Sequence, residues 1–359
     1  MKNRLWIVGI IIVFVIAVVL VSGRSEGGAN NSGPVVSTIA GQKATSGSND
    51  GAGTDAHFGF SAGITTDGTN LYVTDTFNHT IRKVVISTAA VTTLAGTAGI
   101  SGSMDGIGSA ARFNSPQGIT TDGTNLFVAD TVNQTIRKIN IITGQVSTLA
   151  GTAGVIGAAD GIGPNAQFNH PSGITNDGSN LFVADMKNNI VRKILINTGQ
   201  VMTLAGTAGK SGSSDGTGSS ALFNYPAGIT IDGPNLYIVD NSNSTIRKIV
   251  LETGSVTTLA GIAGTLGSTD GTGGAALFNY PLGIASDGNC LFVTDTGNSN
   301  IRKIVISGGQ VTTLAGTTGK VGSDDGNATN ARFSIPSGIV AGTGTTLYIA
   351  DMGAIRKIK

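Results

Sequence analysis

The chain repeats itself every 55 residues, and this spacing limits the folds open to it more than any other feature of the sequence. Each repeat carries a Gly that ends Thr-Leu/Ile-Ala-Gly and an Asp that begins an Asp-Gly pair. The glycines are Gly41, Gly96, Gly151, Gly206, Gly261 and Gly316, and the Asp residues are Asp50, Asp105, Asp160, Asp215, Asp270 and Asp325. A fixed period of this length is typical of one supersecondary unit used several times, so we expect six copies of one unit.

One unit contains four short segments with the composition of strands. In the first unit they are residues 63–66, 71–75, 80–87 and 91–96. They are rich in β-branched and aromatic residues, which favour strands, and the Asp-Gly after the first segment favours a tight hairpin. The second and third segments are apolar on both faces, as expected for a sheet packed between two others. Four antiparallel strands repeated six times predict an all-β fold, a six-bladed β-propeller.

The two ends of the repeat region complement each other. The chain stops just after a third strand, residues 354–358, so the last unit lacks its fourth. A spare fourth-strand sequence, residues 35–41, stands before the first complete unit. We expect this N-terminal strand to complete the last blade, which closes the ring and leaves no long unpaired edge.

The first 34 residues stand outside the repeat. Lys2 and Arg4 precede an unbroken apolar run over residues 5–21, and a Ser/Gly/Asn-rich stretch follows. This pattern predicts a signal peptide or an N-terminal membrane anchor over residues 1–23, a flexible linker over 24–34, and the propeller over 35–359. Both interpretations of the apolar run predict an extracytoplasmic propeller, either membrane-anchored or secreted.

The overall charge excludes one class of partner. The formal net charge of the 359-residue chain is +1, which gives no basic surface for neutralising phosphates, so we expect no nucleic-acid partner. A single cysteine, Cys290, excludes an intramolecular disulfide framework.

One stretch of each unit resembles a known repeat. Residues 70–75, Asn-Leu-Tyr-Val-Thr-Asp, followed by Asn78-His79-Thr-Ile-Arg82, are similar to the NHL repeat, and the similarity recurs over residues 35–359. The resemblance implies a propeller of a family that mostly binds partners, although some members are enzymes and some bind RNA. The eponymous His is present only as His79. The other units carry Gln134, Asn189, Ser244 or Ser299 there, and the last unit loses its Asn.

An Asp and an Arg recur at matched positions of the second and third strands. They are Asp75 and Arg82, Asp130 and Arg137, Asp185 and Arg192, Asp240 and Arg247, Asp295 and Arg302, and Asp351 and Arg356. Equal numbers of opposite charges favour a structural ladder of ion pairs between blades. The alternative is a basic ring, formed with the Lys that follows each Arg, for acidic polymers.

The Asp-Gly segments have features in common with two kinds of ligand site. Asp-Gly-x-Gly-x-x-Ala resembles a dinucleotide fingerprint, but that motif needs a strand before it and a crossover helix after it. The Asp residues could instead bind Ca²⁺, which needs about 6–8 oxygens, whereas each loop offers one or two carboxylates. A turn-capping role is favoured, so we expect no metal and no cofactor.

Residues that differ between units are the candidates for binding. Tyr225 and Tyr280 each precede the Pro of a first strand, and Phe77 and Lys187 follow second strands. Aromatic side chains at a channel mouth suit a partner or ligand, and packing against the preceding loop is the alternative.

These patterns together favour an exported or membrane-tethered interaction module, monomeric, with a protein, peptide or glycan partner. One alternative is a secreted propeller hydrolase or lyase with a metal in the central channel. Another is a structural surface protein without a discrete ligand. First strands offer Thr65, Thr120, Thr175 and Thr230 but no Glu, Asp or His, so we assign no catalytic residue and do not predict an enzyme.

Overall fold

The computed structural model describes residues 33–42 and 46–359, of which 34–359 form one compact unit. The predicted signal peptide or anchor, residues 1–23, and nearly all of the predicted linker lie outside the described residues. Within the part of the chain that is described, no helix is both long enough and apolar enough to cross a membrane.

The propeller has six sheets, one per blade, and each sheet has five strands. The innermost strands are β3 (Ser61–Thr66), β8 (Ile119–Thr121), β13 (Pro171–Asn176), β18 (Pro226–Asp232), β23 (Ile284–Ser286) and β28 (Pro336–Ala341). The second strands are β4 (Asn70–Asp75), β9 (Asn125–Asp130), β14 (Asn180–Asp185), β19 (Asn235–Asp240), β24 (Cys290–Asp295) and β29 (Leu347–Asp351). We number the blades 1 to 6 in this order.

The outer strands complete each blade. The third strands are β5 (Thr80–Val85), β10 (Thr135–Asn140), β15 (Ile190–Leu195), β20 (Thr245–Val250), β25 (Asn300–Val305) and β30 (Ala354–Ile358). The fourth strands are β6 (Ala90–Ala95), β11 (Gln145–Ala150), β16 (Gln200–Ala205), β21 (Ser255–Ala260), β26 (Gln310–Ala315) and β1 (Val35–Gly41). Each pair of neighbouring strands is antiparallel.

A short fifth strand at the outer edge was not predicted. These strands are β2 (Gly51–Ala52), β7 (Gly106–Ile107), β12 (Gly161–Ile162), β17 (Gly216–Thr217), β22 (Gly271–Thr272) and β27 (Gly326–Asn327). In blades 1 to 5 a single 3-10 turn follows, in η1 (Gly53–Asp55), η3 (Gly108–Ala110), η5 (Gly163–Asn165), η7 (Gly218–Ser220) and η9 (Gly273–Ala275). The inter-blade loop therefore covers the edge of the fourth strand, which limits edge-to-edge pairing with other chains.

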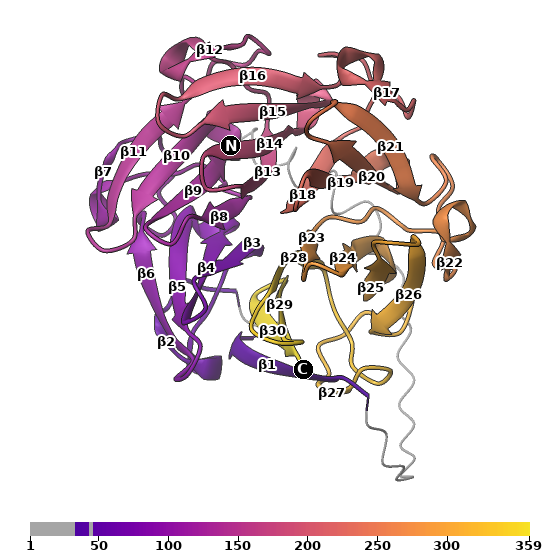
Figure 1. Ribbon diagram of the computed structural model, residues 1–359. Helices are drawn as coiled ribbons and strands as arrows, with labels where there is room; N and C mark the ends of the chain where they lie inside the picture. The colour runs from indigo at the N-terminus through magenta and orange to yellow at the C-terminus, as the bar shows by residue number, and fades with distance from the viewer. Residues whose placement is uncertain (1–32, 43–45) are drawn as a thin grey trace, which may run out of the picture. The chain divides into compact units, whose positions relative to one another are not determined.

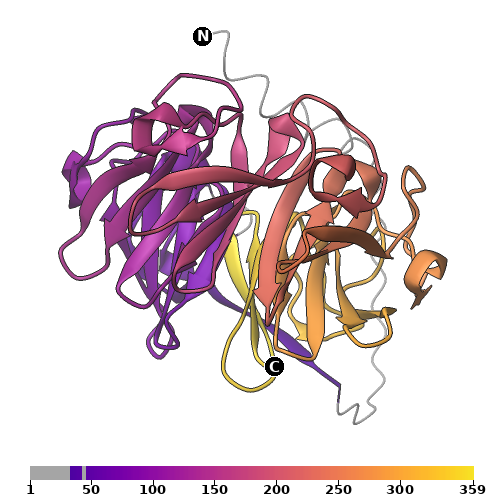
Figure 2. The same cartoon turned by 45° about the horizontal axis from the view of Figure 1, so that its top comes forward.

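The prediction of ring closure is confirmed. Strand β1 pairs antiparallel with β30, with Val36 opposite Ile358 and Gly41 opposite Ala354, so the N-terminal strand completes blade 6. Figure 1 shows β1, in indigo, beside the yellow C-terminal strand β30. The innermost strands contact one another in cyclic order, β28 with β3 included. Figures 1 and 2 show the six sheets around a common centre.

One glycine in each innermost strand, or directly before it, sets how closely neighbouring blades approach. A Cβ on Gly63 would collide with the backbone carbonyl of Gln117 in the next blade, and a Cβ on Gly338 with that of Ala62. The same relation links Gly118, Gly173, Gly228 and Gly283 to their next blades. The Gly of each Gly-Ile pair is thus required where neighbouring backbones touch.

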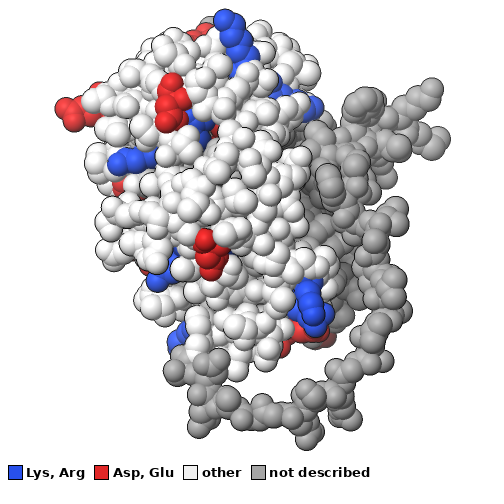
Figure 3. Space-filling view, turned by 90° about the vertical axis from the view of Figure 1, so that its right-hand side faces the viewer, with Lys and Arg blue, Asp and Glu red and all other residues white. Residues whose placement is uncertain are grey.

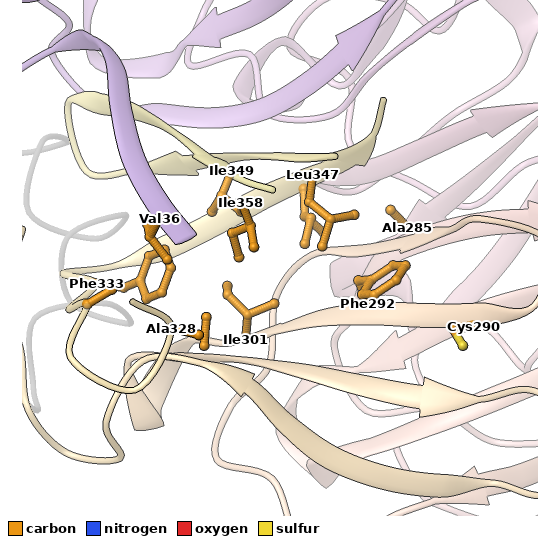
Figure 4. Packing of buried hydrophobic residues seen from close by; sticks show 13 residues of the cluster. Val36, Ala285, Cys290, Phe292, Ile301, Ala328, Phe333, Leu347, Ile349 and Ile358 are labelled. Carbon is orange, nitrogen blue, oxygen red and sulfur yellow. The ribbon is translucent and has the colours of Figure 1, made fainter. Parts of the chain in front are cut away.

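The core lies between blades. Each buried apolar cluster combines residues from two neighbouring sheets, as with Ile301 of blade 5 and Leu347 of blade 6. Figure 4 shows this cluster, with Val36 of β1 beside Phe333 and Ile358. The second strand of most blades is buried at five consecutive residues, as expected for a sheet covered on both faces. Cys290 is a free, buried member of the cluster.

Candidate functional site: a buried centre in each blade and a variable rim

Each blade contains the same buried charged centre. In blade 1, Arg82 donates from Nη1 to Asp75 Oδ2 at 2.9 Å and from Nη2 to Asp50 Oδ1 at 2.8 Å. The Arg82 side chain has no exposed surface, and its guanidinium lies 5.0 Å from the centre of the Phe58 ring. The six Arg residues of these centres are Arg82, Arg137, Arg192, Arg247, Arg302 and Arg356, and each lies between two Asp residues and above a Phe ring.

Each Asp–Arg pair lies within a single sheet, across the hairpin that joins the second and third strands. Asp75 is the last residue of β4 and opposes Thr80, while Arg82 of β5 opposes Val73. The Asp of Asp-Gly has a second partner in the same sheet, because Asp50 Oδ2 accepts the backbone N–H of Thr93 in β6. This Asp therefore fixes the inter-blade loop to an Arg and to the fourth strand, a role that the turn-capping interpretation missed.

Burial sets the electrostatics of these centres. Burial raises the pKa of the Asp240 carboxyl to about 6, against the opposing effect of N–H donors from Asn224 and Asn243 and of the Arg247 guanidinium. Buried ion pairs of this kind fix geometry more than they add stability. Among the described residues, no group of three or more His, Cys, Asp and Glu side chains is placed to hold a metal ion.

The four residues predicted for binding lie at one end of the blades. In each blade, the segment that leads into the innermost strand and the hairpin after the second strand lie together, as shown by the N–H of Lys187 donating to Asn169 O and that of Ser242 to Asn224 O. The hairpins of blades 1 to 5 are the 3-10 turns η2 (Thr76–Asn78), η4 (Thr131–Asn133), η6 (Met186–Asn188), η8 (Asn241–Asn243) and η10 (Thr296–Asn298).

We call this set of positions the rim. Its pre-strand residues are Phe60, Ser115, His170, Tyr225, Tyr280 and Ile335, and its hairpin residues are Phe77, Val132, Lys187, Ser242, Gly297 and Met352, in each case from blade 1 to blade 6. Tyr225 and Tyr280 come from adjacent blades. Phe77 and Lys187 belong to blades 1 and 3 and are separated by blade 2.

Hydrogen bonds between blades hold the rim tyrosines in an unusual conformation. Tyr225 has φ 55° and Tyr280 has φ 45°, values that residues with a Cβ seldom adopt. The N–H of Tyr225 donates to Asn189 Oδ1 at 2.8 Å, and that of Tyr280 donates to Ser244 Oγ at 3.2 Å. A side chain of the preceding blade therefore holds the backbone conformation of each tyrosine.

The same contact explains the position of the eponymous His. His79 Nδ1 accepts the N–H of Ser115 at 3.0 Å, and Gln134 Oε1 accepts that of His170. His, Gln, Asn and Ser all offer a side-chain acceptor, so the residue type varies while the contact between blades remains. This role was not predicted from the sequence. The available indication was that His, Gln, Asn and Ser, which replace one another at this position, can all accept a hydrogen bond.

Blades 4, 5, 6 and 1 give the rim an apolar side. Phe77 is 47% exposed and stacks on Phe60 with 5.1 Å between ring centres. Met352 and Tyr280 are 38% and 36% exposed, and Tyr225 is partly buried. Since blade 6 is next to blade 1, these large side chains occupy four consecutive blades.

Blade 3 provides a polar pair on the rim. Lys187 Nζ lies 3.0 Å from His170 Nε2, and His170 Nδ1 lies 3.1 Å from Asn169 Oδ1. Burial, followed by the nearby Lys187 charge, lowers the pKa of His170 to about 4, and burial lowers the pKa of Lys187. His170 is therefore neutral at pH 7, with Nε2 as the acceptor of a Lys187 N–H. The sequence separated these two residues by 17 positions and gave no reason to pair them.

No protein-family model matches the chain. Among curated proteins, it is 32% identical over 274 residues to the protein SUPPRESSOR OF QUENCHING 1, chloroplastic, of Arabidopsis thaliana, and 30% identical over 284 residues to NHL repeat-containing protein 2 of Bos taurus. These matches cover 71% and 70% of this chain. The chain is an NHL-type β-propeller. The matched regions span only 26% and 39% of the two relatives' lengths.

Solved structures share the fold of this NHL-type propeller. An auxiliary nutrient binding protein from Bacteroides thetaiotaomicron VPI-5482 has a TM-score of 0.68 at 18% identity, over 91% of this chain and 76% of that chain. Virginiamycin B lyase from Staphylococcus aureus has a TM-score of 0.52 at 14% identity, over 91% of this chain and 98% of that chain. The likeness shows the fold alone, and because one protein binds and the other is a lyase, function has to be argued from the site.

Proposed function

We propose that this NHL-type propeller is a binding module that holds a protein, peptide or glycan partner on the rim. The observation that carries the proposal is the series of large apolar side chains on four consecutive blades, Tyr225, Tyr280, Met352 and Phe77, three of which are substantially exposed. Aromatic residues gathered at one place on a surface are typical of binding sites. The six buried centres, by contrast, are the same in every blade and have no exposed Arg surface to offer.

One side of the propeller offers little charge for an alternative electrostatic partner. Figure 3 shows the side of the molecule that lies at the right of Figure 1, where charged side chains are scattered among uncharged residues and some lie beside a side chain of opposite charge. The Arg of each Arg-Lys pair is buried against two carboxylates, as with Arg247, so it contributes no positive surface. These features support an uncharged or weakly charged partner rather than a nucleic acid.

We also propose that the propeller works outside the cytoplasm as a monomer, either anchored or secreted. The support for its location is the sequence of Lys2 and Arg4 before the apolar run of residues 5–21. Fusion of alkaline phosphatase after Lys359 tests the location, because this enzyme is active only after export. An inactive fusion at normal expression would contradict the proposal.

The rim itself is tested on defined arrays of peptides and glycans with the full-length protein in mild detergent. The test variant is Tyr225→Ala with Tyr280→Ala. The control is Ile142→Ala, which removes a side chain that is 90% exposed at the β10–β11 hairpin, the opposite end of its blade. We expect the double variant to lose binding at least about tenfold and the control to keep it. Equal binding by the double variant, or no ligand on either array, would contradict the proposal.

A further inference from the structure

The rim has one charged side chain. Of its twelve positions, ten carry residues that do not ionise near neutral pH, and His170 is neutral because its pKa is about 4. Lys187 is the remaining position, and no rim position carries Asp or Glu. The charge of Lys187 is therefore not balanced by a carboxylate on the rim.

A hydrogen-bonded chain orients this lysine. Asn169 Oδ1 lies 3.1 Å from His170 Nδ1, so the ring donates there and presents Nε2 as an acceptor to Lys187 Nζ at 3.0 Å. A lysine ammonium has three N–H donors and no acceptor. His170 takes one of them, and the others are available for an anionic acceptor brought by a ligand.

The lysine stands at one end of the apolar side of the rim. Lys187 lies in the turn η6, and the next residue after that turn is Asn189, whose Oδ1 accepts the N–H of Tyr225 in blade 4. Tyr280, Met352 and Phe77 follow around the ring in that order. A ligand seated on the rim would thus meet an ammonium first and then apolar side chains from blade after blade.

We propose that the rim takes the free C-terminus of an apolar peptide, with its carboxylate on Lys187 and its last side chains along Tyr225 and Tyr280. This inference rests on the proposed binding function. A carboxylate supplies an acceptor for the ammonium N–H groups that His170 does not take, and charge-assisted hydrogen bonds are stronger than neutral ones. A peptide, rather than a small carboxylic acid, presents several side chains in succession, as four consecutive apolar blades require.

The test uses two pools of N-acetylated hexapeptides that end in Phe and are random at the other positions. One pool has a free C-terminal carboxylate and the other is amidated. Each pool is mixed with the full-length protein in mild detergent, and the retained peptide is measured by mass spectrometry after gel filtration. We expect at least about tenfold more retention of the acid pool, with apolar residues enriched next to the Phe.

Two variants separate charge from shape. Lys187→Met keeps much of the apolar stem and removes the charge, so it should abolish the preference for the acid pool. Lys187→Arg keeps a cation and should retain it. Equal retention of both pools that still depends on Tyr225 would overturn the carboxylate inference and leave the binding function standing. Retention of neither pool would overturn the inference, and the array experiment then decides the binding function by itself.

Discussion

The buried centres and the rim are built by the same repeat but differ in what they hold constant. Every centre has an Arg between two Asp residues and over a Phe ring, with nearly the same distances in six blades. At the rim the side chains differ from blade to blade, from the Phe60–Phe77 stack to the His170–Lys187 pair. A repeat protein needs an identical solution wherever each blade meets the same packing problem. Residues vary where several side chains can meet the same need, as with the acceptors His79 and Gln134, or where side chains face solvent, and a partner can be recognised at the exposed positions.

The largest effect is expected from breaking one centre. Arg247→Met removes the partner of the buried Asp240 and leaves its carboxylate unpaired. We expect the free energy of unfolding to fall by about 3–5 kcal/mol, because an uncompensated buried charge costs that much. Urea denaturation, followed by far-UV circular dichroism, measures this free energy of unfolding. A loss below about 1 kcal/mol would mean that the centre does not hold the blade together.

The next largest loss of stability is expected from a substitution that pushes two neighbouring blades apart. Gly228→Ala would place a Cβ against the carbonyl of Leu282 in the next blade. We expect a loss of about 1–3 kcal/mol from overpacking. Gly308→Ala is the matched control, because a Cβ there would meet no atom within 4 Å. Equal stability of the two variants would contradict the close approach of the innermost strands.

The contacts between blades at the rim are worth less. Asn189→Ala removes the acceptor for the Tyr225 N–H, and we expect the free energy of unfolding to fall by about 0.5–1.5 kcal/mol. Asn189 has φ 58°, so part of that loss comes from placing Ala in a left-handed conformation. Asn189→Gly removes the acceptor but accepts the conformation, so the difference between the Gly variant and the wild type reports the hydrogen bond, and the difference between the Ala and Gly variants reports the conformational cost. A fully stable Gly variant would show that the bond contributes nothing.

The smallest effect is a pH dependence that arises at His170. Its pKa in the folded protein, about 4, lies below the ordinary 6.5, because burial and Lys187 disfavour its charged form. The unfolded chain therefore binds a proton first, so the contribution of His170 is present above pH 6.5 and is lost as the pH falls toward 4. The raised pKa of buried residues such as Asp240 acts in the opposite direction, so the two effects have to be separated.

The difference between wild type and His170→Gln isolates this contribution. Thermal unfolding of both proteins between pH 7.5 and 4 should show the wild type losing stability relative to the variant as the pH falls. A difference that does not change with pH would contradict the buried, neutral state of His170.

The sequence predicted the fold well because the period itself carries the information. Six units, the inter-blade core and closure by residues 35–41 all follow from positions that recur every 55 residues. The two-residue edge strands were missed because a Gly and one neighbour carry no strand pattern. The hairpin spacing was enough to pair Asp75 with Arg82, but Asp50, the second partner of Arg82, lies 32 residues away in the inter-blade loop and was not paired with it.

The rim was harder to predict because its contacts join different blades. The N–H of Tyr225 reaches Asn189 across 36 residues, and only the ring geometry brings them together. His170 and Lys187 belong to one blade, but they are 17 residues apart and meet only because β13 and β14 pair as a hairpin. His170 occupies the repeat position of Tyr225 and Tyr280, and this equivalence could have indicated that His170 belongs to the rim.

The most direct test of the account compares binding and stability in one variant of the rim. Tyr280→Ala removes a side chain that is 36% exposed and leaves all six buried centres unchanged. The account predicts that this variant keeps the wild-type melting temperature and loses retention of the acid peptide pool at least about tenfold. A lower melting temperature with unchanged retention would show that the rim serves the fold and would contradict the division between a constant centre and a variable binding surface.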